Sequence, residues 1–320
     1  MLISADAALY FRRGLTHGVL AMLVLPVLLT GAIYLWHRWR GGGSTQQAEI
    51  QQAETQQAQL PFRPGAILLL AFLGVCSHPL LDWLNTYGVR LLMPFDGTWF
   101  YGDTLFIIDP WMWLLTAAGI VLAHSRSRKA LSGWAILLAI TSGLVLGIGF
   151  VSGGVKLLWV VGITAIVLLL PQSGIHRQAS LVARGGMTLL LLYIGTAYLL
   201  AREAESLLSA QYPHASVVQA NPVPGNPTAH RLLVVEEDQY RIVSPAREDL
   251  QLPRQAADAT VQQALASPTL RGFSNWMRFP YWQTEASEDG WIVNFWDLRY
   301  QEPGQPAITG VGFARVVVPK

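Results

Sequence analysis

Five residues that can bind a metal ion lie in or beside the most apolar part of the sequence. They are His17, His78, Asp82, Asp103 and Asp109. His78 and Asp82 are four residues apart, so they share one face of a helix. Ionisable groups are costly in apolar surroundings and are usually kept there for a function. Histidine and carboxylate ligands together predict a site for one or two divalent ions, with positions left open for water.

Four of these residues also have a structural interpretation. His78 can be a buried histidine bonded to a carbonyl group, and Asp82 can orient it without binding a metal. Asp109 precedes Pro110, a pair typical of a helix N-cap followed by the first helical residue. Asp103 lies in the tetrapeptide Tyr-Gly-Asp-Thr, which is typical of a turn. For each of these four residues, a role in a metal site and a structural role both remain open.

A basic pair, Arg12 and Arg13, stands shortly before His17. Taken alone, His17 would be an interfacial histidine, and the pair would be a topology signal. Guanidinium groups also bind phosphate with paired hydrogen bonds. Arg12 and Arg13 are therefore candidate substrate-binding residues.

The composition indicates a membrane protein. The 320 residues are 52% hydrophobic and only 13% charged, against about 25% charged in an average soluble protein. The net charge of +2 gives no sign of a nucleic-acid partner, and we expect none. The single cysteine, Cys76, excludes an internal disulfide framework and a cysteine-based zinc site.

Six apolar runs, each near the ~20 residues needed to cross a bilayer, predict a polytopic bundle of about six transmembrane helices. The runs are Gly18–Trp36, Gly65–Leu84, Leu105–Ala123, Trp134–Val151, Val155–Leu170 and Gly185–Ala201. The loops after the first, third and fifth runs hold more Lys and Arg than the others, so we expect them in the cytoplasm. The N-terminus, the five metal-binding candidates and the C-terminal part then lie at the outer, periplasmic face.

The sequence predicts a mainly α-helical membrane protein with a small soluble β-rich C-terminal domain. Its expected parts are a first motif and helix (1–40), a Gln/Ala-rich cytoplasmic linker (41–64), a helical bundle with the metal site (65–202) and the β-rich domain (203–320). Alternating runs predict strands in this last part. They are Arg231–Val235, Tyr240–Val243, Trp291–Tyr300 and Val311–Val318.

Three motifs carry a resemblance to a known family. They are RRGLTHG at 12–18, HPLLDWLNTYGVRLLMPFD at 78–96 and GDTLFIIDPWMW at 102–113, with weaker matches at 220–243, 273–282 and 290–300. The chain resembles the YdjM-type family of LexA-binding, inner-membrane-associated proteins regarded as metal-dependent hydrolases. The resemblance implies that His17, His78, Asp82 and Asp109 belong to a metal centre, with Asp103 close by. Members usually have an upstream helix with further ligands, which this sequence lacks. Either such a segment precedes residue 1, or the site is reduced and inactive.

The leading hypothesis is a membrane-embedded hydrolase of an ester or phosphoester, acting on a small or lipid-linked substrate. A divalent metal, with zinc expected, would activate a water molecule. Asp103, or Asp82, would accept the proton. The alternatives are a non-catalytic regulatory protein that binds a protein partner through its C-terminal domain, and a transporter. A transporter predicts repeats or ionisable groups along several spans, and the last three apolar runs hold almost none.

Overall fold

The computed structural model describes residues 9–41, 63–125, 127–172, 174–243, 248–305 and 311–319. Most of the predicted linker therefore lies outside the described residues. The chain forms two compact units. We call Phe11–Trp83 with Tyr87–Tyr101 the N-terminal unit, and Leu84–Thr86 with Gly102–Lys320 and Met1–Tyr10 the C-terminal unit.

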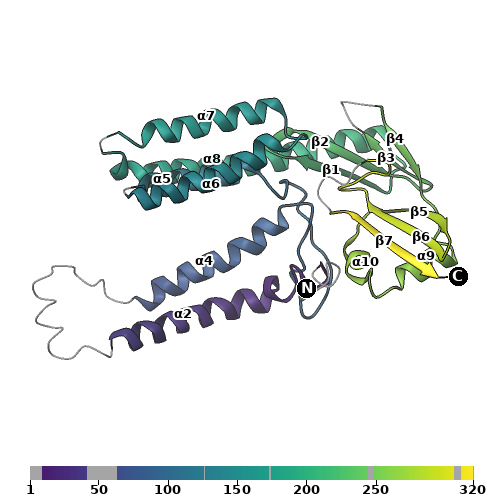
Figure 1. The fold of residues 1–320 in the computed structure, drawn as a ribbon, viewed down its shortest axis with the longest axis horizontal. Helices are drawn as coiled ribbons and strands as arrows, with labels where there is room; N and C mark the ends of the chain where they lie inside the picture. The colour runs from purple at the N-terminus through teal and green to yellow at the C-terminus, as the bar shows by residue number, and fades with distance from the viewer. Residues whose placement is uncertain are drawn as a thin grey trace, which may run out of the picture. The chain divides into compact units, whose positions relative to one another are not determined.

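The N-terminal unit contains two long apolar helices that pack side by side (Figure 1). Helix α2 runs over Val19–Gly41 and helix α4 over Pro64–Trp83. A short 3-10 helix, η1 (Leu15–His17), precedes α2, and an irregular segment follows α4. Both helices are long and apolar enough to cross a membrane. They place the start of α2 and the end of α4 at the same end of the pair.

The C-terminal unit begins with four helices: α5 (Pro110–His124), α6 (Arg128–Gly147), α7 (Gly153–Leu169) and α8 (Ile175–Gln211). Serine caps at Ser127 and Ser152 accept backbone hydrogen bonds and fix the starts of α6 and α7. Helices α6 and α8 have the length and composition of membrane spans, whereas α5 and α7 are shorter apolar helices. The predicted helical part is confirmed. Of the six predicted spans, four are both long enough and apolar enough to cross a membrane, namely α2, α4, α6 and α8.

Helix α8 is the main difference from the sequence prediction. The apolar run Gly185–Ala201 is only the middle of a helix of 37 residues, Ile175–Gln211. At 1.5 Å per residue, a helix of this length extends for roughly 55 Å, which exceeds the ~30 Å of hydrocarbon. Its last turns therefore lie beyond the apolar layer, where they contact strands β1 and β2.

The β-rich C-terminal part is also confirmed, as two antiparallel sheets. The first contains β1 (Val217–Val223), β2 (Asn226–Val235), β3 (Gln239–Val243) and β4 (Leu250–Pro253) in that order. The second contains β5 (Pro280–Ser287), β6 (Gly290–Asp297) and β7 (Phe313–Pro319), also in order. Two short helices, α9 (Ala259–Leu265) and α10 (Arg271–Trp276), connect the sheets.

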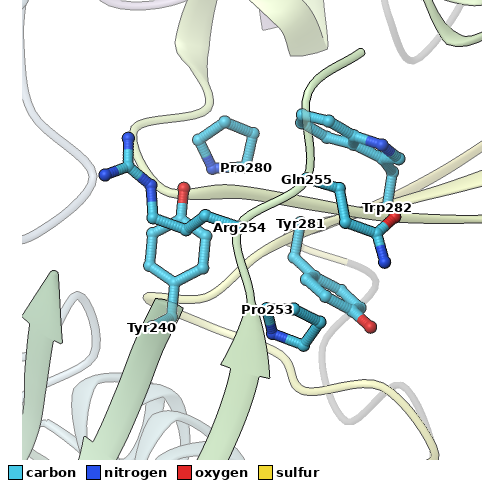
Figure 2. Close-up of a pocket in the computed structure, with 7 residues that line it drawn as sticks. All are labelled: Tyr240, Pro253, Arg254, Gln255, Pro280, Tyr281 and Trp282. Carbon is cyan, nitrogen blue, oxygen red and sulfur yellow. The ribbon is translucent and has the colours of Figure 1, made fainter. Parts of the chain in front are cut away.

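One apolar core joins the two sheets. Leu233 and Ile242 of the first sheet pack with Trp296 of the second sheet and with Leu298 just after β6, and all four are nearly or fully buried. A cavity of about 130 Å³ lies beside this core, where the start of β3 and the end of β4 meet the start of β5 (Figure 2). Its aromatic wall includes Tyr240, over whose ring the Arg254 guanidinium lies 5.5 Å from the centroid.

Candidate metal centre

The first motif folds into a tight turn that presents His17. Arg13 has a left-handed backbone (φ 52°), and the next residues form η1. Gly14 and Gly18 flank this turn, and both are buried. A side chain at Gly14 would lie 2.8 Å from the Arg90 guanidinium, and one at Gly18 would collide with the Met93 carbonyl oxygen. The two glycines therefore let the segment after α4 approach the His17 turn closely.

Backbone hydrogen bonds hold the turn against that segment. The Arg90 N–H donates to the Arg13 carbonyl at 3.0 Å, and the Val19 N–H donates to the Leu91 carbonyl at 2.9 Å. Because these bonds lie on both sides of η1, they fix where His17 stands relative to the end of α4.

Helix α4 supplies the other two residues of the cluster. His78 and Asp82 lie one turn apart near its C-terminal end, as the four-residue spacing predicts. The buried Pro79 lies between them within the helix. Asp82 is mostly buried, with a side chain 15% exposed, whereas His78 is 69% exposed.

The three side chains converge on one carboxylate oxygen. Asp82 Oδ2 lies 3.2 Å from His17 Nε2 and 3.6 Å from His78 Nε2. All three atoms lie within 4.8 Å of one another, so one ion can contact them all. Zinc bonds of about 2.0–2.1 Å place tetrahedral ligand atoms about 3.3–3.4 Å apart. The two distances to Asp82 Oδ2 are close to this spacing, and three protein ligands would leave the fourth position of a tetrahedral ion open.

The environment of His17 Nε2 also fits a metal ligand. His17 Nε2 is buried and has no hydrogen-bond partner among the residues that the structure describes. Asp82 Oδ2 is near enough for an ion pair but lacks the geometry of a hydrogen bond. The other ring nitrogen, Nδ1, lies 2.9 Å from the Thr16 hydroxyl. If Nδ1 donates to that hydroxyl, the Nε2 lone pair faces the cluster, as a ligand requires.

Arg13 binds the same aspartate from the other side. Its guanidinium contacts Asp82 Oδ1 at 2.9 Å, donates to the Gly88 carbonyl at 3.1 Å and lies 4.4 Å from the Tyr87 ring centroid. Asp82 thus offers Oδ2 to the histidines while Oδ1 is held by an arginine. Arg12 is exposed, and its carbonyl accepts a bond of 3.4 Å from the Arg90 guanidinium.

Asp109 belongs to the C-terminal unit and caps helix α5. Its Oδ1 accepts the Trp111 backbone N–H at 2.9 Å, and Pro110 is the first helical residue. The Tyr193 hydroxyl on α8 donates to Oδ2 at 2.6 Å. Both carboxylate oxygens therefore have protein donors, and the N-cap interpretation accounts for this residue.

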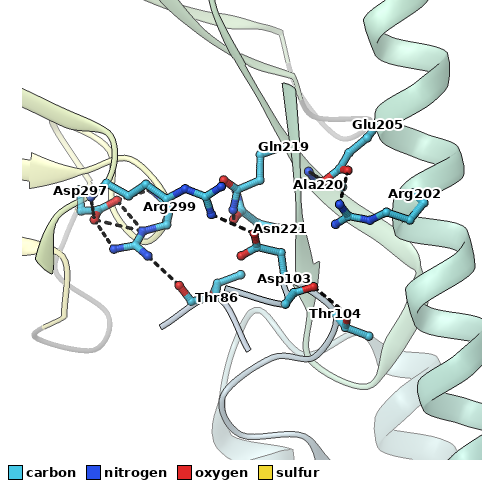
Figure 3. A network of polar contacts seen from close by, with 12 residues as sticks. Thr86, Asp103, Thr104, Arg202, Glu205, Gln219, Ala220, Asn221, Asp297 and Arg299 are labelled. Atoms are coloured by element: carbon cyan, nitrogen blue, oxygen red, sulfur yellow. Dashed lines mark hydrogen bonds and ion pairs between the residues drawn. The ribbon is translucent and has the colours of Figure 1, made fainter. Parts of the chain in front are cut away.

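Asp103 also lies in the C-terminal unit, within a buried polar network (Figure 3). Its backbone is left-handed (φ 47°), and its Oδ2 pairs with Arg278 at 2.8 Å. The Arg278 backbone N–H in turn donates to Asp297, whose carboxylate pairs with the fully buried Arg299 at 2.6 Å. Asp103 Oδ1 is buried without a hydrogen-bond partner in the described part of the chain.

The comparison with protein families gives one match. The profile of the YdjM inner membrane protein family covers residues 2–204, which is more than half of the chain. The chain belongs to the YdjM family. The match contains η1, α4 and the three clustered residues, and it ends inside α8. The two sheets of this YdjM protein lie beyond it. Searches of curated proteins and of solved structures give no match.

Two residues that contact the candidate aspartates were not apparent from the sequence. Tyr193 and Arg278 contact Asp109 and Asp103 across 84 and 175 residues of sequence. No spacing pattern connects such distant positions. Thr16 beside His17 was a detectable signal, because a hydroxyl next to a ligand histidine can fix its tautomer.

Proposed function

We propose that this YdjM-family protein is a membrane-embedded, metal-dependent hydrolase of an ester or phosphoester. The observation that carries the proposal is the convergence of His17, His78 and Asp82, with the buried Nε2 of His17 lacking a hydrogen-bond partner in the described chain. Two neutral imidazoles and one carboxylate, with an open position, are a ligand set typical of hydrolytic zinc sites.

A divalent ion such as zinc, when bound here, would lower the pKa of its water to about 7 and polarise the scissile bond. The protein supplies the remaining functions. Thr16 orients the His17 ring, and Arg13 fixes the Asp82 carboxylate so that one oxygen is directed at the histidines. The exposed His78 leaves the cluster accessible to a substrate.

Two further roles form part of this proposal. Asp103 as a proton acceptor and Asp109 as an additional metal ligand are the roles expected from the sequence, and the proposal includes them. Arg12 and Arg13 would face an anionic substrate group. The proposal also retains the periplasmic location of the cluster and of the two sheets, inferred from the basic loops.

The decisive experiment measures metal content. The full chain is purified in lipid nanodiscs, loaded with zinc or cobalt, and compared with His78→Ala and His17→Ala. A matched control is His124→Ala, which removes an exposed histidine at the end of α5. We expect about one ion per chain in wild type and control, and loss in both cluster variants.

Cobalt absorption bands and turnover of chromogenic esters and phosphoesters complete the experiment. A tetrahedral cobalt spectrum that disappears in His17→Ala supports the ligand assignment. Wild-type protein that takes up no metal, or cluster variants that hydrolyse substrate as well as wild type, would overturn the proposed function.

A further inference from the structure

The helices of the C-terminal unit enclose a large apolar cavity. Its volume is about 360 Å³, within the range of roughly 300–1,000 Å³ typical of small-molecule sites. The walls come from α5, α6 and α7, and they include Trp113, Trp134 and Trp159. Leu131 and Leu137 of α6 also line it and are 42% and 46% exposed, so α6 does not seal the cavity from its surroundings.

One polar group in this wall has no partner. The Trp134 indole nitrogen is buried and has no hydrogen-bond acceptor within the described residues. Two other polar groups of the wall are satisfied: Trp159 donates to the Ser142 hydroxyl at 3.1 Å, and Thr141 donates to the Leu137 carbonyl at 2.9 Å. Buried tryptophan N–H groups usually have an acceptor. The cavity therefore fits an occupant that is apolar along its length and carries one acceptor near Trp134.

Basic residues lie at one end of the cavity. Chain order brings the end of α5, the start of α6 and the end of α7 to one side, where Val121, Leu131 and Leu170 line it. Arg128 and Lys129 begin α6 on that side. Trp134 follows Arg128 by six residues, which is about 9 Å along the helix axis. The headgroup layer on each side of the hydrocarbon is about 5–7 Å thick, so an Arg128 at the outer edge of this layer would place the indole near the depth of lipid ester groups.

We propose that this cavity binds one acyl chain of a membrane phospholipid, with an ester carbonyl accepting the Trp134 N–H. The phosphate of the same lipid lies toward Arg128 and Lys129, where basic side chains attract anionic headgroups. The occupant is a bilayer lipid because α6 has the length and composition of a membrane span, so the open side of the cavity faces hydrocarbon. This inference does not depend on the metal centre, which lies in the N-terminal unit.

Photo-crosslinking tests the proposal. The full chain is placed in nanodiscs of dioleoylphosphatidylglycerol that contain a trace of the same lipid with a diazirine in one acyl chain, and adducts are mapped by mass spectrometry. The exposed leucines of α2 report ordinary lipid contact within the same molecule. We expect labelling at the cavity wall to exceed labelling at α2, and to fall in Ala117→Phe, which fills the cavity.

The hydrogen bond is tested with ether lipid, which has the same chains without ester carbonyls. We expect ester lipid to compete about three- to tenfold better than ether lipid at the wild-type cavity. The preference should disappear in Trp134→Phe and persist in the control Trp39→Phe, which changes an exposed tryptophan of α2.

Labelling of the cavity that is equal to labelling of α2, and that is unchanged in Ala117→Phe, would show contact with surrounding lipid only and would overturn the site. An equal ester preference in wild type and Trp134→Phe would overturn the role of the indole.

Discussion

A single methyl group at Gly18 should disturb the metal cluster without touching any ligand. Gly18 has an extended backbone (φ −76°, ψ 162°) that alanine adopts freely. The added Cβ would collide with the Met93 backbone carbonyl, which cannot rotate away as a side chain would. The His17 turn must then move from the segment after α4, and the bond between Val19 and Leu91 lengthens or breaks.

The magnitude follows from these contacts. Overpacking costs about 1–3 kcal/mol, and the strained hydrogen bond contributes about 1 kcal/mol more. Because His17 directly precedes Gly18, its Nε2 is displaced from Asp82, and misplaced ligand support typically costs roughly 10- to 100-fold in metal affinity. Gly18→Ala should therefore lower both the stability of the N-terminal unit and its zinc affinity.

Gly31→Ala is the matched control, because it makes the same chemical change 13 positions later, within α2. A Cβ there meets no atom within 4 Å among the residues described. Alanine in a helix interior is favoured over glycine by about 1 kcal/mol, so this variant should be slightly stabilised and should bind zinc normally. Thermal unfolding in nanodiscs, with and without zinc, measures both effects. Equal stability and zinc affinity of Gly18→Ala and Gly31→Ala would refute the reasoning.

Three other perturbations give measurable outcomes. Arg299→Met leaves the fully buried Asp297 carboxylate without its arginine, so unfolding of the sheet region should cost about 3–5 kcal/mol less than in wild type. Tyr193→Phe removes the 2.6 Å bond to Asp109, and thermal unfolding should show a loss of about 1–3 kcal/mol, because a buried acceptor loses its donor. Burial and a neighbouring arginine lower the pKa of His230 below its ordinary 6.5, so the unfolded chain takes up a proton first as pH falls. Wild type should therefore lose more stability than His230→Gln between about pH 7.5 and about pH 5.5, and parallel pH profiles would contradict this.

Sequence reasoning predicted that His78 and Asp82 lie one helical turn apart, and the alternation of the apolar runs predicted His17 at the same membrane face. The spacing of His78 and Asp82 on an apolar run was sufficient, because a helix converts four residues into one turn. The approach of His17 required tertiary contacts of two glycines with the segment after α4. The ion pair between Arg13 and Asp82 was not predicted, since nothing in the spacing of these residues distinguishes a partner of the aspartate from a substrate-binding arginine.

The strands that sequence patterns missed are all sheet edges. Strands β1, β4 and β5 each pair on one side only. An edge strand buries less and often carries proline or polar residues, so its alternation is weak. β4 is only four residues long, and β5 includes Gln283, Thr284 and Glu285. The inner strands β2, β3 and β6 retained a clear pattern because apolar residues occupy their inward positions in the shared core. The edge strand β7 was also predicted, because its Val316 and Val318 alternate with exposed residues and are buried.

The turn between β1 and β2 has a consequence for the order of biosynthesis. Gly225, with its left-handed backbone (φ 63°), packs against Pro110 and Val155, and its carbonyl accepts the Trp111 indole N–H at 2.8 Å. A side chain at this position would collide with the starts of both α5 and α7. Domains generally form from the N-terminus during translation, yet these two short helices gain a contact at their starts only from a hairpin made about 70 to 115 residues later. The contact of this hairpin with the starts of α5 and α7 can therefore form only after residue 225 has left the ribosome.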